Sequence, residues 1–276
     1  MRRLAGARLL IVAVLATVVV VLGLTVLIGR TAQRQAPFVG APQAVLGPVV
    51  LVPGYGGKTR SVEVLAAKIR ATGRTAEVFP LPGDGTGDLR AQAQALDAFV
   101  DKVRGSAPSV DVIGYSAGGV VTRIWIDDLG GRAVARRVVT LGSPHHGTRV
   151  AGLARAFVSS SCPSACQQLA PDSAVLSGLN TADETPSGPL WTSLWTDYDQ
   201  IVTPPESGRL AGSTAIRLQS VCADERVDHS GLPESPLVAG IVLESIGVPA
   251  PKQATAADCR ELRTLGGNPT PSHGGL

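Results

Sequence analysis

The chain has 276 residues, of which 44% are hydrophobic and 17% charged, and its formal net charge is +3. Arg2, Arg3, Arg8 and Arg30 account for the positive sign, because the rest of the chain has 21 basic and 22 acidic residues. A nearly neutral body without a basic stripe argues against a nucleic-acid-binding protein. After a leader, roughly 245 residues remain, which suffices for one α/β domain with a sizeable core.

The first strong element is an uncharged apolar run of 21 residues from Leu9 to Gly29. As a helix it would be about 30 Å long, the thickness of a bilayer's hydrocarbon core. Arginines precede the run, and the residues after it match a signal-peptidase site poorly. We therefore expect residues 1–30 to be an uncleaved signal anchor, a single transmembrane helix with the rest of the chain outside the cytoplasm. A cleaved leader and a secreted protein are the alternative.

Residues 31–46 are expected to be a linker, and apolar runs alternate with helical spacing in the domain that follows, residues 47–250. The runs that predict strands lie at residues 48–53, 77–81, 110–113, 137–141, 193–196 and 214–218. The segments with helical spacing lie at residues 60–71, 88–103, 117–129 and 236–246. Uninterrupted apolar strands that alternate with helices are typical of a doubly wound, mostly parallel sheet.

Two regions lack this regular alternation. Residues 149–190 are rich in Ser, Pro and Gly and follow a predicted strand, so we expect a lid-like insertion there. Residues 251–276 are expected to be a C-terminal tail, partly disordered, because the stretch beyond Gly266 consists mainly of Gly, Pro and Ser.

The most informative motif is Gly114-Tyr115-Ser116-Ala117-Gly118, which lies between a predicted strand and a predicted helix. G-x-S-x-G in this context is typical of the nucleophile elbow of α/β-hydrolases, where a sharp turn exposes a serine hydroxyl above the sheet. The turn needs glycine on both sides, because a Cβ there would collide with neighbouring backbone. The sequence therefore predicts an α/β-hydrolase fold with Ser116 as the nucleophile.

A serine nucleophile needs a base, and the base needs an orienting acid; in this fold they follow the serine in the order acid, then histidine. His229 lies after the last predicted strand and is the predicted base, whereas His145 and His146 precede the candidate acids. Asp199 is the favoured acid because it follows the next-to-last strand, just before the loop turns away from the sheet. Asp197, two residues earlier, remains an alternative.

Attack on an ester creates an oxyanion that backbone N–H groups must stabilise. We expect these donors at Ala117, which follows the nucleophile, and at Tyr55, in the glycine-rich loop after the first strand. The same loop, Gly54 to Thr59, resembles a phosphate-binding loop, but Val52 occupies the position of its first glycine. We therefore expect no nucleotide, no other cofactor and no metal. Asp111 precedes the nucleophile and is expected to be structural.

The four cysteines are Cys162, Cys166, Cys222 and Cys259. An even number in an exported domain indicates disulfides, and we favour Cys162–Cys166 and Cys222–Cys259, although spacing alone does not fix the pairing. A zinc site is the weaker alternative, since Cys-x3-Cys is not accompanied by paired histidines.

Several segments, in order, resemble bacterial class 2 lipases, which are small α/β-hydrolases. The segments that carry the resemblance are residues 52–57, 114–119, 141–148, 168–173, 192–202 and the loop around His229. The resemblance implies hydrolysis of carboxylic esters, triacylglycerols among them, with Ser116, Asp199 and His229 as the triad. Members often have histidine where this chain has Pro53 and Tyr115; both departures lie beside the expected pocket and bear on substrate choice and rate more than on reaction type.

We therefore predict a serine hydrolase that cleaves carboxylic esters through an acyl-enzyme, as a triacylglycerol lipase or a lipase-like esterase. Its expected partners are an ester or lipid substrate and, through the N-terminal helix, a membrane; we expect a monomer that binds no nucleic acid. Two alternatives remain at this stage. One is a cell-envelope acyltransferase that uses the same triad, and the other is a non-catalytic binding protein with a hydrolase fold.

Overall fold

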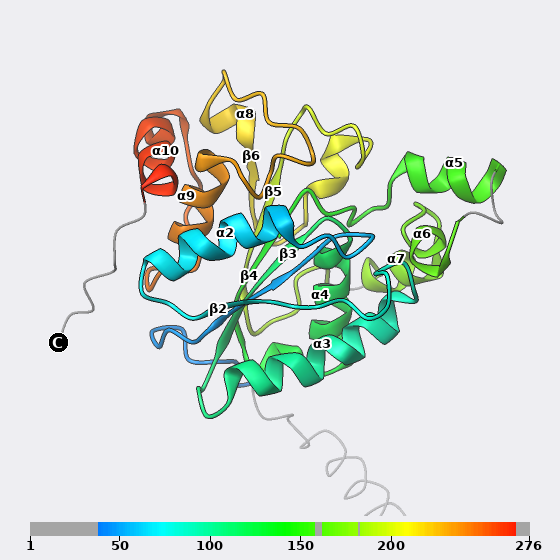
Figure 1. The fold of residues 1–276 in the computed structure, drawn as a ribbon, viewed down its shortest axis with the longest axis horizontal. Coiled ribbons are helices and arrows are strands. Elements are labelled where there is room, and N and C mark those ends of the chain that lie inside the picture. Colours follow the sequence, from blue (N-terminus) through cyan, green and yellow to red (C-terminus); the bar gives the residue numbers. More distant parts are fainter. Residues whose placement is uncertain (1–37, 158–161, 182, 269–276) are drawn as a thin grey trace, which may run out of the picture. The chain divides into compact units, whose positions relative to one another are not determined.

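Six parallel strands form the central sheet in the order β2-β1-β3-β4-β5-β6 (Figure 1). The strands are β1 (Val49–Val52), β2 (Ala76–Val78), β3 (Val110–Tyr115), β4 (Ala135–Leu141), β5 (Leu190–Trp195) and β6 (Thr214–Arg217). Every neighbouring pair is parallel. The order reverses between β1 and β3, and at such a switch point the loops leaving the carboxyl ends of the strands diverge to form a crevice.

This computed structural model describes residues 38–157, 162–181 and 183–268. The apolar run Leu9–Gly29, predicted to span a membrane, lies outside the described residues. Within the described ranges, no helix combines the length and apolar character that a membrane crossing requires. Residues 39–276 form one of two units of the chain, and the elements below all belong to it.

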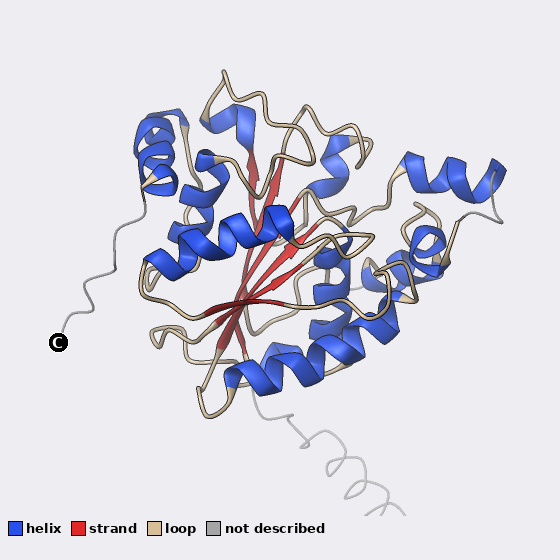
Figure 2. Ribbon diagram, in the orientation of Figure 1, coloured by secondary structure: helices blue, strands red, loops and turns tan. Residues whose placement is uncertain are grey.

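Helices cover both faces of the sheet (Figure 2). On one face, α3 (Leu89–Arg104) and α4 (Ala117–Asp128) pack against alternate strand residues such as Val50 and Val52. On the other face, α2 (Arg60–Ala71) and α9 (Pro236–Ser245) pack against the intervening residues, such as Val49 and Leu51. All four residues of β1 are fully buried, as expected for a strand covered on both faces. The predicted parallel, doubly wound sheet is confirmed.

All six predicted strands are present, but their boundaries differ from the prediction by one to three residues, and two of these differences have a clear cause. β2 ends at Val78, before Pro80, which lacks the N–H that a ladder hydrogen bond requires. β4 begins at Ala135, two residues before the predicted start at Arg137, and the added part contains the fully buried Arg136. Hydrophobic patterning treats arginine as a surface residue and so places the start of this strand too late.

The buried Arg136 is explained by Asp111 near the amino end of β3. The Asp111 carboxylate accepts hydrogen bonds from Nε of Arg136 at 2.9 Å and from Nη2 of Arg74 at 2.7 Å. Asp111 and Arg136 are both fully buried, and buried charges persist only when they are paired in this way. Asp111 therefore has a structural position at the end of the strand opposite Ser116.

Three short helices lie between β4 and β5, where the lid-like insertion is predicted. They are α5 (Arg149–Phe157), α6 (Ser164–Gln168) and α7 (Ala174–Leu179). Gln168 accepts a hydrogen bond from the first amide of α3, and the carbonyl of Leu179 accepts one from Arg123 of α4. The disulfide Cys162–Cys166 closes the turn into α6. A lid function for this segment remains a prediction.

The C-terminal region contains a helix that the sequence analysis did not predict. α10 (Cys259–Gly267) lies within the segment expected to be a tail, while residues 269–276 lie outside the described residues. It packs backbone to backbone on α9, since a Cβ at Gly240 would lie 2.0 Å from the Leu262 carbonyl oxygen. The disulfide Cys222–Cys259 fixes the start of α10 to the residue that follows α8 (Leu218–Val221).

Both favoured disulfides are present, and they should differ in their contribution to stability. They join cysteines separated by 4 and 37 residues respectively. Replacing Cys222 and Cys259 together by Ala should lower the free energy of unfolding by about 4 kcal/mol, and the same change at Cys162 and Cys166 by about 2 kcal/mol, because the longer loop restricts the unfolded chain more. Equilibrium urea unfolding measures both values. A larger loss from the short-loop pair would contradict this expectation.

Candidate active site

The sharp turn at Ser116 is formed by two close backbone approaches. Ser116 lies between β3 and α4 with φ 53° and ψ −127°, and it is the only non-glycine residue with positive φ in the described part of the chain. A Cβ at Gly118 would lie 2.3 Å from the carbonyl oxygen of Val52, and one at Gly114 would lie 2.5 Å from the Cα of Gly119. The strand and helix can therefore meet at this angle only with glycine at both positions.

Ser116, His229 and Asp199 form a continuous hydrogen-bonded row. Nε2 of His229 lies 3.0 Å from Oγ of Ser116, and Nδ1 of the same ring lies 2.7 Å from Oδ2 of Asp199. All three residues are less than 9% exposed. The three side chains come from loops that follow β3, β5 and β6, and the structure thus brings together the residues that the sequence singled out.

Of the two candidate acids, only Asp199 takes part in this row. Its second oxygen, Oδ1, accepts backbone hydrogen bonds from Ile201 at 2.9 Å and Val202 at 2.7 Å. Both carboxylate oxygens therefore have partners, and the one facing His229 is fixed in direction. Asp197 instead pairs with Arg217 at 3.3 Å on the surface.

The two other candidate histidines have different partners. His145 is completely buried, and Nε2 of its ring lies 2.9 Å from Oγ1 of Thr140. Burial, together with the nearby Arg123 cation, holds the pKa of His145 well below its usual value, so this ring is neutral. His146 pairs with Glu184 at 2.9 Å. Neither ring has a hydrogen bond to Ser116 among the described residues.

The glycine-rich loop after β1 lies directly against Ser116. A Cβ at Gly54 would be only 2.9 Å from Cβ of Ser116. The amides of Gly56 and Gly57 donate to the carbonyls of Gly85 and Gly54, but within the described ranges the amide of Tyr55 has no acceptor. The amide of Ala117 lies at the start of α4. The amides of Tyr55 and Ala117 therefore remain available to an anion near Ser116.

Gly142 was not identified from the sequence, although its Cα lies so close to Asp199 and His229 that a side chain there would disturb the hydrogen-bonded row. It follows β4 directly and has φ 52°. A Cβ here would lie 2.5 Å from Leu232, 3.1 Å from Oδ2 of Asp199 and 3.3 Å from Nδ1 of His229. Glycine immediately after a parallel strand was the available signal, but the sequence does not show which side chains approach it.

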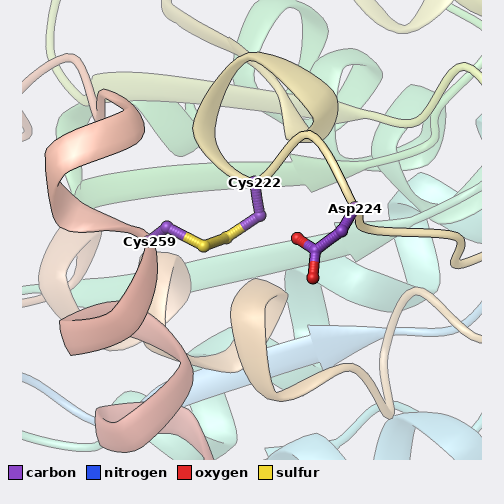
Figure 3. Close-up of side chains that lie close together, drawn as sticks. All are labelled: Cys222, Asp224 and Cys259. Carbon is purple, nitrogen blue, oxygen red and sulfur yellow. A yellow bond between two sulfur atoms is a disulfide. The ribbon is translucent and has the colours of Figure 1, made fainter.

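One further group contains residue types that can bind a metal. Ligand atoms of Cys222, Asp224 and Cys259 lie within 4.8 Å of one another (Figure 3). The two sulfur atoms are joined in a disulfide, whereas metal binding requires a thiolate. The Asp224 carboxylate pairs with Arg263 at 3.0 Å. This group is therefore a disulfide beside an ion pair, and it does not support the zinc alternative.

Comparison with protein families identifies the chain. The profile of the family "Lipase (class 2)" matches residues 47–232. The chain belongs to the class 2 lipase family. The matched region contains both glycine loops and all three residues of the hydrogen-bonded row. At the level of the family, the prediction of a carboxylic ester hydrolase is confirmed.

Solved lipase structures share the fold of this chain at low sequence identity. Lipase B of Aspergillus fumigatus is 17% identical with a TM-score of 0.64, covering 84% of this chain and 59% of its own. The mature lipase BlEst2 of Bacillus licheniformis is 18% identical with a TM-score of 0.61, covering 76% of this chain and 95% of its own. The chain thus spans less than two thirds of the fungal enzyme. No curated protein matches the sequence.

Replacing Gly142 by Ala should disable the site without unfolding the protein. The new methyl group would push His229 and Asp199 apart, and a displacement of about 1 Å at a reacting group can cost about 100-fold in kcat. Gly73→Ala is the matched control, because Gly73 also has positive φ but nothing within 4 Å of its added Cβ. Turnover of a short p-nitrophenyl ester and the melting temperature report on both variants. Wild-type kcat in Gly142→Ala would contradict the assignment.

Proposed function

We propose that the protein hydrolyses carboxylic esters with Ser116 as nucleophile, His229 as general base and Asp199 as orienting acid. The observation that supports this most directly is the unbroken row of hydrogen bonds from Asp199 through His229 to Ser116, at 2.7 and 3.0 Å. In this arrangement Nδ1–H of His229 donates to Asp199, which leaves the Nε2 lone pair directed at the serine hydroxyl.

The first half-reaction forms the acyl-enzyme. His229 takes the proton from Oγ of Ser116 as the oxygen attacks the ester carbonyl, and the negative charge moves to the carbonyl oxygen. The amides of Tyr55 and Ala117 then donate to this oxyanion; one such donor is typically worth about 3 kcal/mol in the transition state. When the tetrahedral intermediate collapses, the alkoxide leaves with the proton that His229 carries.

The second half-reaction restores the enzyme. Water takes the place of the alcohol, His229 accepts one of its protons, and the resulting hydroxide attacks the acyl carbonyl. The carboxylic acid is released as Oγ of Ser116 regains its proton from His229. Every proton movement uses the same imidazole nitrogen, so this scheme depends on side chains and backbone amides of the chain itself.

The proposed substrate class is an ester with an apolar acyl chain, such as a triacylglycerol. Two exposed aliphatic residues support it: Ile201, whose amide donates to Asp199, is 50% exposed, and Val150 is 46% exposed. They belong to neighbouring segments, since the hydroxyl of Thr148 donates to the carbonyl of Ile201 at 2.5 Å. Exposed apolar residues beside a reactive site favour a substrate that is itself apolar.

We also propose that the domain works outside the cytoplasm. The two disulfides support this location, because such bonds persist in oxidising compartments. The N-terminal run that would hold the domain at a membrane lies outside the described residues, so the anchor remains a proposal based on sequence.

The assignment of the nucleophile is tested with a fluorophosphonate probe, which reacts covalently with an activated serine. Wild-type protein should be labelled, and Ser116→Ala should not, because the attacking oxygen is missing. Ser177→Ala, which removes the hydroxyl of an exposed serine in α7, is the control and should be labelled like wild type. Equal labelling of wild type and Ser116→Ala would exclude Ser116 as the nucleophile.

The substrate class is tested by measuring hydrolysis of p-nitrophenyl esters and glycerides of increasing acyl length. An apolar-chain specificity predicts that kcat/KM rises at least about tenfold from acetyl to octanoyl esters, since each buried methylene contributes about 0.8 kcal/mol. Rates below and above the solubility limit of each ester separate a lipase from an esterase of dissolved substrates. A preference for acetyl esters at all concentrations would contradict a lipid substrate.

A further inference from the structure

We infer that Tyr115 is a positioning residue that fixes the backbone of His229 relative to Ser116, an inference that rests on the proposed function. Tyr115 is the last residue of β3 and immediately precedes the nucleophile. Its hydroxyl donates a hydrogen bond to the backbone carbonyl of His229 at 3.1 Å. One side chain therefore joins the strand that carries the nucleophile to the loop that carries the base, across 114 positions of sequence.

The ring of Tyr115 also limits the orientation of the imidazole. The centroids of the two rings lie 5.3 Å apart with an interplanar angle of 33°. Gly142 lies close to Nδ1 of His229, where a Cβ would come within 3.3 Å. The imidazole is thus in contact with an aromatic ring and close to backbone that excludes any side chain, which leaves it little room to rotate.

The hydroxyl of Tyr115 is suited to this role because it stays protonated. Burial raises the pKa of Tyr115 above its usual value, and the negative charges of Asp199, Asp228 and Glu234 raise it further. A neutral phenol is a donor, and a backbone carbonyl is an acceptor only, so the direction of this hydrogen bond is fixed.

Other contacts hold the His229 loop but do not replace this one. The hydroxyl of Thr196 donates to the carbonyl of Val227 at 2.8 Å, and Oδ1 of Asp228 accepts from the amide of Gly231 at 2.9 Å. Thr196 follows β5, so it ties the loop to the segment that carries the acid. Tyr115 alone among these residues ties it to the segment that carries the nucleophile.

This arrangement predicts an effect on kcat rather than on KM. The side chain of Tyr115 packs against the buried cluster formed by α2 and α9, on the side of the sheet away from α3 and α4. Loss of its hydroxyl would let the loop relax and lengthen the contact between Nε2 and Oγ, which slows proton transfer. Substrate binding would change little, because the hydroxyl is engaged by the protein backbone.

The test compares Tyr115→Phe, which removes only the hydroxyl, and Tyr115→Leu, which also removes the ring, with Tyr198→Phe. Tyr198 lies in the loop after β5, and within the described part of the chain its hydroxyl has no hydrogen bond; its ring lies against Arg226. For Tyr115→Phe we expect kcat on a short p-nitrophenyl ester to fall about fivefold, the effect of one neutral hydrogen bond, with KM within about twofold. Tyr115→Leu should lose more, and Tyr198→Phe should match wild type.

Two kinetic outcomes would overturn the inference. An unchanged kcat in Tyr115→Phe would show that the hydrogen bond does not position the base. A raised KM with an unchanged kcat would show that Tyr115 contacts the substrate instead. Melting temperatures of all variants separate either outcome from a loss of fold.

An NMR measurement distinguishes failure of this inference from failure of the proposed function. The ring signals of His229, assigned with His229→Ala, should broaden or divide in Tyr115→Phe because the imidazole samples more than one position. Unchanged signals would overturn the inference whatever the kinetics show. If wild type neither turns over esters nor reacts with the fluorophosphonate, the proposed function fails, and the NMR comparison still decides the role of Tyr115.

Discussion

The candidate active site depends on the backbone conformation of one residue, Ser116, which has a positive φ that side-chain-bearing residues rarely adopt. Such a conformation costs of order 1–3 kcal/mol and persists only where the surroundings impose it. Here the surroundings are backbone atoms, because the start of α4 lies against the carbonyl oxygens of Val52 and Pro53 at Gly118. The strain is offset by the burial of β1 and β3 between two helical layers.

The remaining parts of the site follow from strand order. Because all strands are parallel, the loops that leave their carboxyl ends meet at one edge of the sheet. β3 lies between β1 and β4, so the loop with Tyr55 and the residue Gly142 flank Ser116 from adjacent strands. Asp199 and His229 follow the next two strands, β5 and β6. Residues that are far apart in sequence thus become neighbours without a long connection across the sheet.

The sequence predicted those features that depend on local pattern. Alternating apolar strands and amphipathic helices gave the parallel sheet, and G-x-S-x-G with the order of acid and histidine identified the hydrogen-bonded row. Gly142, the Tyr115 contact and α10 were not predicted, since each depends on a close approach between distant segments. α10 packs on α9 through Gly240, which lies against the backbone of Leu262. From sequence alone, glycine at this position indicates only a residue of low helix propensity. The burial of Arg136 in β4 was not predicted for the same reason, because its partner Asp111 lies on another strand.

The two ends of β3 are fixed by different means. At the carboxyl end, positions 114 and 118 must be glycine because there is no room for a side chain. This requirement leaves most other positions free to vary. At the amino end Asp111 is held by Arg74 and Arg136, and a buried ion pair adds little net stability compared with apolar packing. We interpret it as fixing the register of β3 against β4, since a shift of either strand would leave a buried charge unpaired. A strand fixed at both ends gives Ser116 little freedom, so the precision of the site depends on the loops that bring His229 and Asp199 to it.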